Sequence, residues 1–207
     1  MGADNVLVVF SSDHGTAPVP EVNLARKMPG GRLTDAALAK AVQSALSARY
    51  GEGNWVASVG ENGMCLNHDL AEQKKIDPAD LSRTAAQVLA AIPHVFRVYT
   101  WESLSTGAYP QDEVSRRVVN GFFPRRTGDL TILLDPYWVP YGTGTAHGGV
   151  FSYDSHVPVI FLGAGIRPGR YFQSIAVNDV APTLAAILEI ETPSASTGRV
   201  LAEMFAR

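Results

Sequence analysis

Asp13 and His14, adjacent at the end of an apolar run, are the residues best suited to chemistry in this chain. The run, residues 6–10, has strand length and is rich in β-branched residues, which is typical of a strand buried on both faces in a parallel sheet. Gly15 then permits a sharp turn. Chemistry in open α/β sheets collects at the carboxyl ends of strands. This position therefore favours a functional role for the Asp-His pair.

Carboxylate and imidazole together suit a borderline divalent metal such as zinc. Neighbouring residues on an ideal strand point to opposite faces. Asp13 and His14 can therefore share one metal only if the backbone turns between them, and otherwise they face two metals. The structural alternative is that Asp13 caps the following turn and His14 is a surface residue. The residue types alone leave both interpretations open.

Later in the chain, three more residues could support such a site: His147, Asp154 and His156. His147 lies in the segment GTGTAHGG, where small neighbours leave the imidazole uncrowded and backbone N–H groups can approach an anion. Taken alone, an incidental histidine in a flexible glycine-rich loop is the simpler interpretation. Asp154 is placed to orient a ligand imidazole, as metal-bound histidines require. His156, before a predicted strand, is expected to be partly buried and to support a ligand by a hydrogen bond rather than to bind metal.

Composition limits the function classes. The 207 residues are 46% apolar and 18% charged, which is typical of a globular domain. A net charge of −3 without a basic stripe argues against nucleic-acid binding, and no apolar run is long enough to span a membrane. The single cysteine, Cys65, excludes an internal disulfide. The first four residues lead directly into a core strand with no signal peptide, so we expect a chain cut from a longer protein.

Hydrophobic patterning and capping residues predict the elements that position these side chains. Residues 16–32 are rich in proline and glycine and are expected to be irregular, and Glu61-Asn62-Gly63 is a predicted hairpin turn. The order of elements predicts a small α+β subdomain, residues 51–100, inserted into an α/β domain of residues 1–50 and 101–207. The predicted strands are 6–10, 55–59, 64–67, 94–100, 129–134 and 157–162, and the predicted helices are 36–50, 78–91, 112–122 and 179–188.

An ordered set of motifs carries a family resemblance. The motifs are SSDHGTAPVPE, ENGMCLNHDLAEQKK, GTAHGGVFSYDSHVPVIFLGAGI and NDVAPTLAAILEI, the last followed by GRVL at residues 198–201. Together they resemble the alkaline phosphatase superfamily, most closely the monomeric bacterial phosphatases related to nucleotide pyrophosphatases and phosphodiesterases. The resemblance covers the whole chain. It implies an alkaline-phosphatase-like α/β fold, a mostly parallel sheet flanked by helices, of which this chain is the C-terminal half.

The resemblance also implies a reaction and its cofactors. Such enzymes use two divalent metals, usually zinc, and a Thr or Ser nucleophile to hydrolyse phosphate esters. By position, Asp13 and His14 match the pair that holds the nucleophile-side metal, and His147 matches a ligand of the second metal. The nucleophile and the other ligands precede the DHG strand in the family and have no counterpart here. We therefore expect the chain alone to be inactive and to lack the full metal set.

Other interpretations stay open from the sequence. A phosphodiesterase, nucleotide pyrophosphatase or sulfatase would share the motifs, and a non-catalytic scaffold module is the alternative outside enzymes. An open reading frame continuing upstream through a nucleophile would favour the enzyme. The expected partner is a small phosphate ester, not nucleic acid or membrane, and the exposed flank of a core strand predicts self-association. The family generally works in the periplasm or outside the cell.

Overall fold

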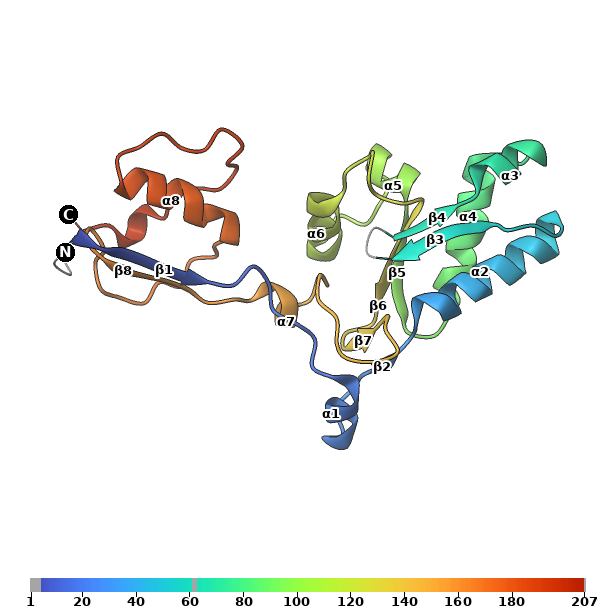
Figure 1. Ribbon diagram of the computed structural model, residues 1–207, viewed down its shortest axis with the longest axis horizontal. Helices are drawn as coiled ribbons and strands as arrows, with labels where there is room; N and C mark the ends of the chain where they lie inside the picture. Colours follow the sequence, from blue (N-terminus) through green and yellow to red (C-terminus); the bar gives the residue numbers. More distant parts are fainter. Residues whose placement is uncertain (1–4, 61–62, 207) are drawn as a thin grey trace. The chain divides into compact units, whose positions relative to one another are not determined.

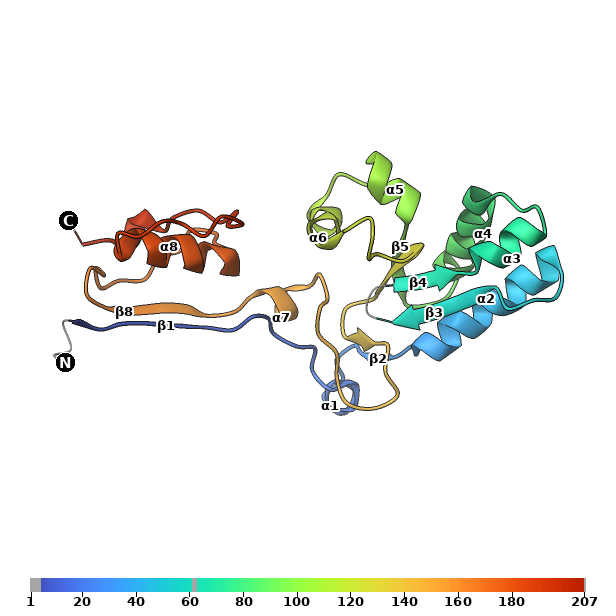
Figure 2. The same ribbon diagram turned by 45° about the horizontal axis from the view of Figure 1, so that its top comes forward.

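The computed structural model describes residues 5–60 and 63–206, which fall into two compact units (Figures 1 and 2). One unit combines the segments Met1–Gly15 and His156–Arg207, and the other is Thr16–Ser155. The predicted turn at Glu61-Asn62 lies outside the described residues. Within the described part of the chain, no helix has the length and apolarity needed to cross a membrane.

The first unit is a two-stranded ribbon with a helix. Strand β1 (Leu7–Ser11) pairs antiparallel with β8 (Val159–Gly163), and α8 (Val180–Ile187) follows the one-turn helix η2 (Val177–Asp179). A second one-turn helix, η3 (Ala202–Met204), lies near the end of the chain. Figure 2 shows α8 on one side of the ribbon. The strands and α8 lie within two residues of the predicted ranges at each end.

Hydrogen bonds explain why two of the family motifs lie together in this unit. The Asp179 carboxylate accepts from the Ala176 and Arg199 N–H groups at 2.9 and 2.8 Å. The Thr183 hydroxyl donates to the Asp179 carbonyl and accepts from the Leu201 N–H. NDVAPT is thus bound to GRVL by buried polar groups, which gives both motifs a structural role.

One face of the ribbon is uncovered. Four large apolar side chains on it are 48–67% exposed, and they form two cross-strand pairs: Val8 with Leu162, and Phe10 with Ile160. We predicted that residues 6–10 form a strand of a parallel sheet and are buried on both faces. For β1 among the described residues, this prediction is wrong. The reason is that β8 is its only partner among the described residues and runs antiparallel to it, so only alternate side chains are covered.

The second unit contains the main core. Its sheet has the order β3-β4-β6-β5, all antiparallel, with β3 at Val56–Gly60, β4 at Gly63–Leu66, β5 at Val95–Thr100 and β6 at Leu130–Leu134. Helices α2 (Asp35–Tyr50) and α4 (Pro78–Ala90) pack against it. Fully buried apolar side chains from these helices and strands form one cluster: Val42, Leu46, Trp55, Met64, Leu81, Leu89 and Leu130.

Side-chain caps mark the beginnings of three helices. The Thr34 hydroxyl accepts from the Ala37 N–H at the start of α2, and Asp77 caps α4. Asp112 accepts from the Ser115 N–H at the start of α6 (Glu113–Gly121). Two shorter helices follow strands directly in the chain: α3 (His68–Gln73) comes after β4, and α5 (Trp101–Thr106) comes after β5.

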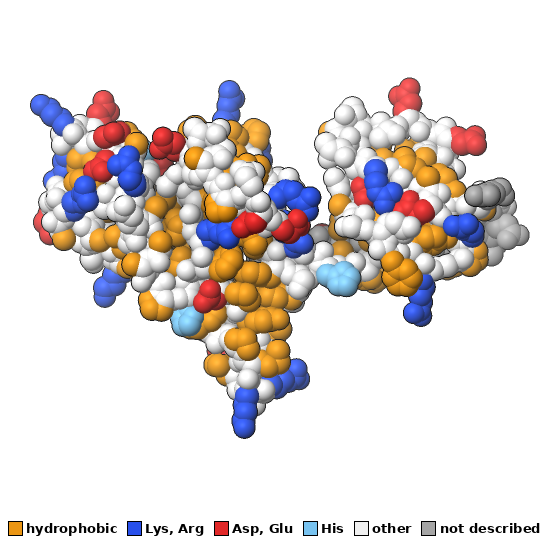
Figure 3. Space-filling model, turned by 180° about the vertical axis from the view of Figure 1, so that it is seen from behind, with side chains coloured by type: hydrophobic (Ala, Val, Ile, Leu, Met, Phe, Trp, Pro, Cys, Tyr) orange, Lys and Arg blue, Asp and Glu red, His pale blue; other side chains and the backbone are white. Residues whose placement is uncertain are grey.

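Several short elements were not predicted. Helix α1 (Pro20–Ala25) lies in the segment expected to be irregular, and α7 (Ser152–Ser155) lies in a predicted loop. Strands β2 (Gly31–Arg32) and β7 (Trp138–Val139) form a two-residue parallel pair. Elements this short contain too few residues to show a hydrophobic period. Figure 3 shows hydrophobic side chains gathered on the α1 projection, where Val19, Val22, Leu24 and Met28 are exposed.

The α/β class is confirmed, whereas the mostly parallel sheet is wrong for the strands of this chain. Only β2 and β7 pair in parallel among the described residues, and the pairs β1–β8, β3–β4, β4–β6 and β5–β6 are all antiparallel. The inserted subdomain, residues 51–100, stays a prediction. Its strands share a sheet with β6, and its helix α4 packs on α2, both from outside that range.

Candidate metal centre and its supporting loop

Asp13 and His14 follow the end of β1 after one intervening residue, and both are exposed. The backbone turns between them, so that Asp13 Oδ2 and His14 Nε2 lie 3.5 Å apart. The His14 Nδ1 atom donates to the Gly15 carbonyl at 2.7 Å. In the neutral ring this places the lone pair on Nε2, the nitrogen nearer the carboxylate. A carboxylate oxygen and an imidazole nitrogen therefore converge, as two ligands of one metal would.

Electrostatics keep the Asp13 carboxylate charged. Its pKa is lowered first by the hydrogen bond from the His14 N–H, 3.0 Å long, and second by attraction to the His14 imidazole. The Ser12 hydroxyl lies 3.4 Å from the same oxygen. Metal ligation requires the ionised carboxylate and a neutral imidazole, and the hydrogen bond from the His14 N–H favours the ionised carboxylate whichever form the ring takes.

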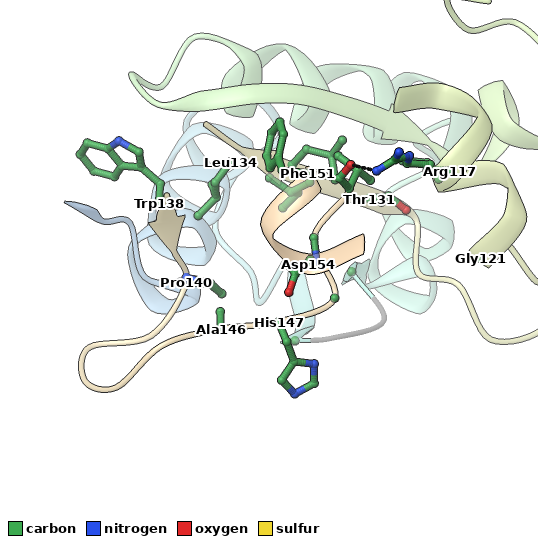
Figure 4. A pocket seen from close by; sticks show the side chains of 18 of the residues that line it. Arg117, Gly121, Thr131, Leu134, Trp138, Pro140, Ala146, His147, Phe151 and Asp154 are labelled. Carbon is green, nitrogen blue, oxygen red and sulfur yellow. Dashed lines mark hydrogen bonds between the residues drawn. The ribbon is translucent and has the colours of Figure 1, made fainter. Parts of the chain in front are cut away.

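His147 belongs to the other unit and is exposed on a glycine-rich loop, residues 142–149. Figure 4 shows its imidazole directed away from Phe151 and Trp138. Asp154 fixes the loop just after the histidine, because its buried carboxylate accepts from the Gly149 N–H at 2.6 Å. A Cβ atom at Gly149 would lie 2.7 Å from that carboxylate, so any larger residue there would require the carboxylate to shift.

The loop is also fixed just before His147. The Ala17 N–H and the Thr16 hydroxyl both donate to the Ala146 carbonyl at 3.0 Å. In return, the Thr145 hydroxyl donates to the Ala17 carbonyl. Two segments separated by about 130 residues are thus joined by three hydrogen bonds. The His147 backbone is constrained from both sides, by Ala146 and by Gly149.

The remaining predicted residue behaves differently. His156 is exposed rather than partly buried, because β8 begins only at Val159 and leaves His156 in the preceding segment. Its proposed support of a metal ligand stays a prediction. Across residues 5–60 and 63–206, no three His, Cys, Asp or Glu side chains gather into a group that could hold a metal. Asp13 and His14 supply two converging donors.

A cavity of about 450 Å³ lies within the second unit, beside the loop that carries His147. Figure 4 shows side chains from β6, β7, α6 and the loop around it. Arg117 of α6 donates to the Val150 carbonyl at 2.7 Å and to the Ser155 hydroxyl at 2.6 Å, which ties α6 to α7. Neither Arg117 nor the cavity was predicted from the sequence. The sequence signal for Arg117 was its spacing from Glu113, which lies four residues earlier on α6 and pairs with it.

Comparison with known proteins places these motifs in context. No family model matches the chain. Three relatives match 98–100% of its length: a calcium-transporting ATPase of Myroides odoratus (30% identical), the alkaline phosphatase PhoV of Synechococcus elongatus (32%) and the alkaline phosphatase PafA of Elizabethkingia meningoseptica (30%). The chain spans only 36–38% of the length of these curated relatives.

A solved structure agrees with the sequence relatives. The crystal structure of wild-type alkaline phosphatase PafA superimposes with a TM-score of 0.88 at 28% identity, over 98% of this chain and 39% of that one. A variant of the same enzyme gives 0.86. The resemblance expected from the motifs is confirmed: over nearly its whole length, this chain is similar in sequence and fold to a portion, rather more than a third, of the alkaline phosphatases.

Proposed function

We propose that this chain is the C-terminal part of a metal-dependent phosphate-ester hydrolase. In this proposal Asp13 and His14 hold one divalent metal, His147 holds a second, and zinc is the metal that the donors suit. The nucleophile and the remaining ligands come from residues outside this sequence. When bound, the metals activate the nucleophile and stabilise the leaving oxygen of a small phosphate ester.

The observation that carries the proposal is the convergence of Asp13 Oδ2 and His14 Nε2 to 3.5 Å at the end of a strand. The donation from His14 Nδ1 to a carbonyl supports it, because metal-binding histidines commonly fix their tautomer in this way. The near-complete coverage of this chain by alkaline phosphatases gives the reaction class.

Asp154 and His156 have supporting roles in the proposal. Asp154 acts through the Gly149 N–H and positions the backbone after His147, without touching the metal. His156 supports a ligand by a hydrogen bond. Since three ligands cannot complete two zinc sites, the isolated chain is expected to bind zinc weakly and to be inactive.

Zinc titration of the 207-residue chain, followed by NMR of the imidazole signals, tests the ligand assignment. The five histidines provide internal controls. We expect the signals of His14 and His147 to shift or broaden at the lowest zinc concentrations, and those of His68 and His94 to change only at higher ones. His68 and His94 are suitable controls because each contacts an aspartate outside the proposed centre, Asp129 and Asp135 respectively.

The variants His14→Ala and His147→Ala assign the signals and remove one proposed ligand each. If all the histidine signals change together, or if those of His68 or His94 change at lower zinc concentrations, the assignment is refuted. Turnover of p-nitrophenyl phosphate is measured on the same samples. Robust zinc-dependent turnover by this chain would refute the part of the proposal that places the nucleophile elsewhere.

A further inference from the structure

The cavity of the second unit is of a size that small molecules occupy. Its volume of about 450 Å³ is within the usual range of roughly 300–1,000 Å³ for ligand pockets. The wall is formed by β6, the end of α6, β7 and the loop from Ala146 to Asp154 (Figure 4). His147 contributes to the wall, so the cavity lies next to one of the proposed metal ligands.

Aromatic rings on the wall are held in place by neighbours. Trp138 stacks on His94 with ring centroids 3.6 Å apart and planes 12° apart. Phe151 lies between Phe96 and Tyr153, at 5.9 and 5.8 Å. His94 and Gly31 already pack against Trp138. By contrast, the Phe151 and Tyr153 rings, held beside each other, need little reordering to accept a flat ligand, which lowers the entropic cost of binding. The wall therefore favours another aromatic ring.

The charges on the wall disfavour an anion inside the cavity. Arg117 lines it as a cation, but Arg117 is already paired with Glu113 at 3.0 Å as well as with two groups of the α7 segment. Two carboxylates, Asp35 and Asp154, also line it. Burial raises the pKa of Asp35, so desolvation opposes its charge. A neutral group suits this wall better than a phosphate.

We propose that the cavity binds an uncharged aromatic group of one or two rings. The inference rests on the proposed function: the aromatic group is the organic part of the ester, and the phosphate stays outside the cavity on the side of His147. Phe151 and Tyr153 then determine the preference for aromatic esters. These residues position the organic group and take no part in bond breaking.

Two glycines on the wall have open space where a side chain would begin. Gly121, at the end of α6, and Gly60, at the end of β3, both line it, and a Cβ atom at either position meets nothing within 4 Å. Gly142 has equally open surroundings but does not line the cavity. Gly121→Leu and Gly60→Leu are therefore blocking variants, and Gly142→Leu is the matched control.

The probe is 2-naphthol, added to the metal-free 207-residue chain and followed by its fluorescence. We expect saturable binding that weakens by about tenfold or more in either blocking variant, equivalent to about 1.4 kcal/mol, and stays within about twofold in Gly142→Leu. Circular dichroism identifies a misfolded variant, in which case the other blocking variant decides. Exposed apolar surfaces elsewhere are unchanged in all three variants, so non-specific binding would be equal.

Lack of saturable binding, or equal affinity in the blocking and control variants, would overturn the inference. Because the assay contains no metal and no hydrolysis, this result would leave the proposed function intact. Conversely, the chain could bind naphthol while zinc has no selective effect on His14 and His147. That result would refute the proposed function but support the aromatic site.

Discussion

The contact between Asp154 and Gly149 predicts a specific coupling between two substitutions. Asp154→Ala removes the acceptor of the Gly149 N–H, now 2.6 Å away, and a hydrogen bond to a charged group contributes about 1.5–3 kcal/mol. Gly149→Ala places a methyl group 2.7 Å from the Asp154 carboxylate, and overpacking of this kind costs about 1–3 kcal/mol. Each variant alone should lower the free energy of unfolding.

Together, the two substitutions should cost less than the sum of their separate effects. Once the carboxylate is gone, the added methyl group has no oxygen to displace, and the same hydrogen bond cannot be lost twice. The expected coupling is about 1–2 kcal/mol. Asp154→Asn is a milder change, because an amide oxygen of the same shape can still accept from the Gly149 N–H.

Urea unfolding of the four chains, followed by far-UV circular dichroism, gives the coupling as a difference of free energies. Gly148→Ala is the control: its residue has φ +81° and open surroundings, so alanine is strained there whether or not Asp154 is present. Gly148→Ala should therefore lower the free energy of unfolding by about the same amount with Asp154 and with Asp154→Ala. If Asp154→Ala and Gly149→Ala add to within about 0.4 kcal/mol, the contact does not act as described.

Three further predictions concern stability and association. The hydrogen bonds from Arg32 lower the pKa of Glu21 to about 2, so their stabilising effect is complete above pH 4.5 and is lost as pH falls towards 2; an NMR titration of Arg32→Gln should return the midpoint towards 4.5. Gln43→Leu should cost about 2 kcal/mol in urea unfolding, because Gln43 accepts from the Trp55 N–H at 2.8 Å, and Gln43→Glu should also be destabilising, because the Gln43 amide donates to the Gly53 carbonyl at 2.6 Å and a carboxylate cannot. Leu162→Lys should reduce the self-association that light scattering is expected to detect in the unaltered chain, since the exposed ribbon face then carries a charge; an unchanged mass would place the contact elsewhere.

Local signals predicted much of the fold correctly. Thr34 and Asp77 mark helix starts because an N-cap depends on a side chain and on N–H groups two or three residues away. The apolar run at residues 6–10 correctly indicates a strand, but neither its partner nor its burial is local information. Strand direction depends on β8, about 150 residues further along the chain.

For the candidate site, too, the residue types could be predicted from the sequence, whereas their geometry could not. Residue types identified Asp13 and His14, but their 3.5 Å approach depends on a turn that an ideal strand does not contain. The role of Asp154 in orienting an imidazole stays a prediction, and its hydrogen bond to the Gly149 N–H was not predicted. The cavity could not be predicted, because its wall combines segments from Ala17 to Asp154 whose proximity depends on the tertiary fold.

The three hydrogen bonds between residues 16–17 and 145–146 have a consequence for how this region can change in evolution. They close a loop of almost 130 residues at its base. Lengthening a closed loop costs little, about 0.6 kcal/mol for each doubling if it is flexible. Segments inserted or deleted between the two ends should therefore leave the backbone before His147 in place. We expect insertions at the surface of this unit to leave the histidine in place at the base of the loop.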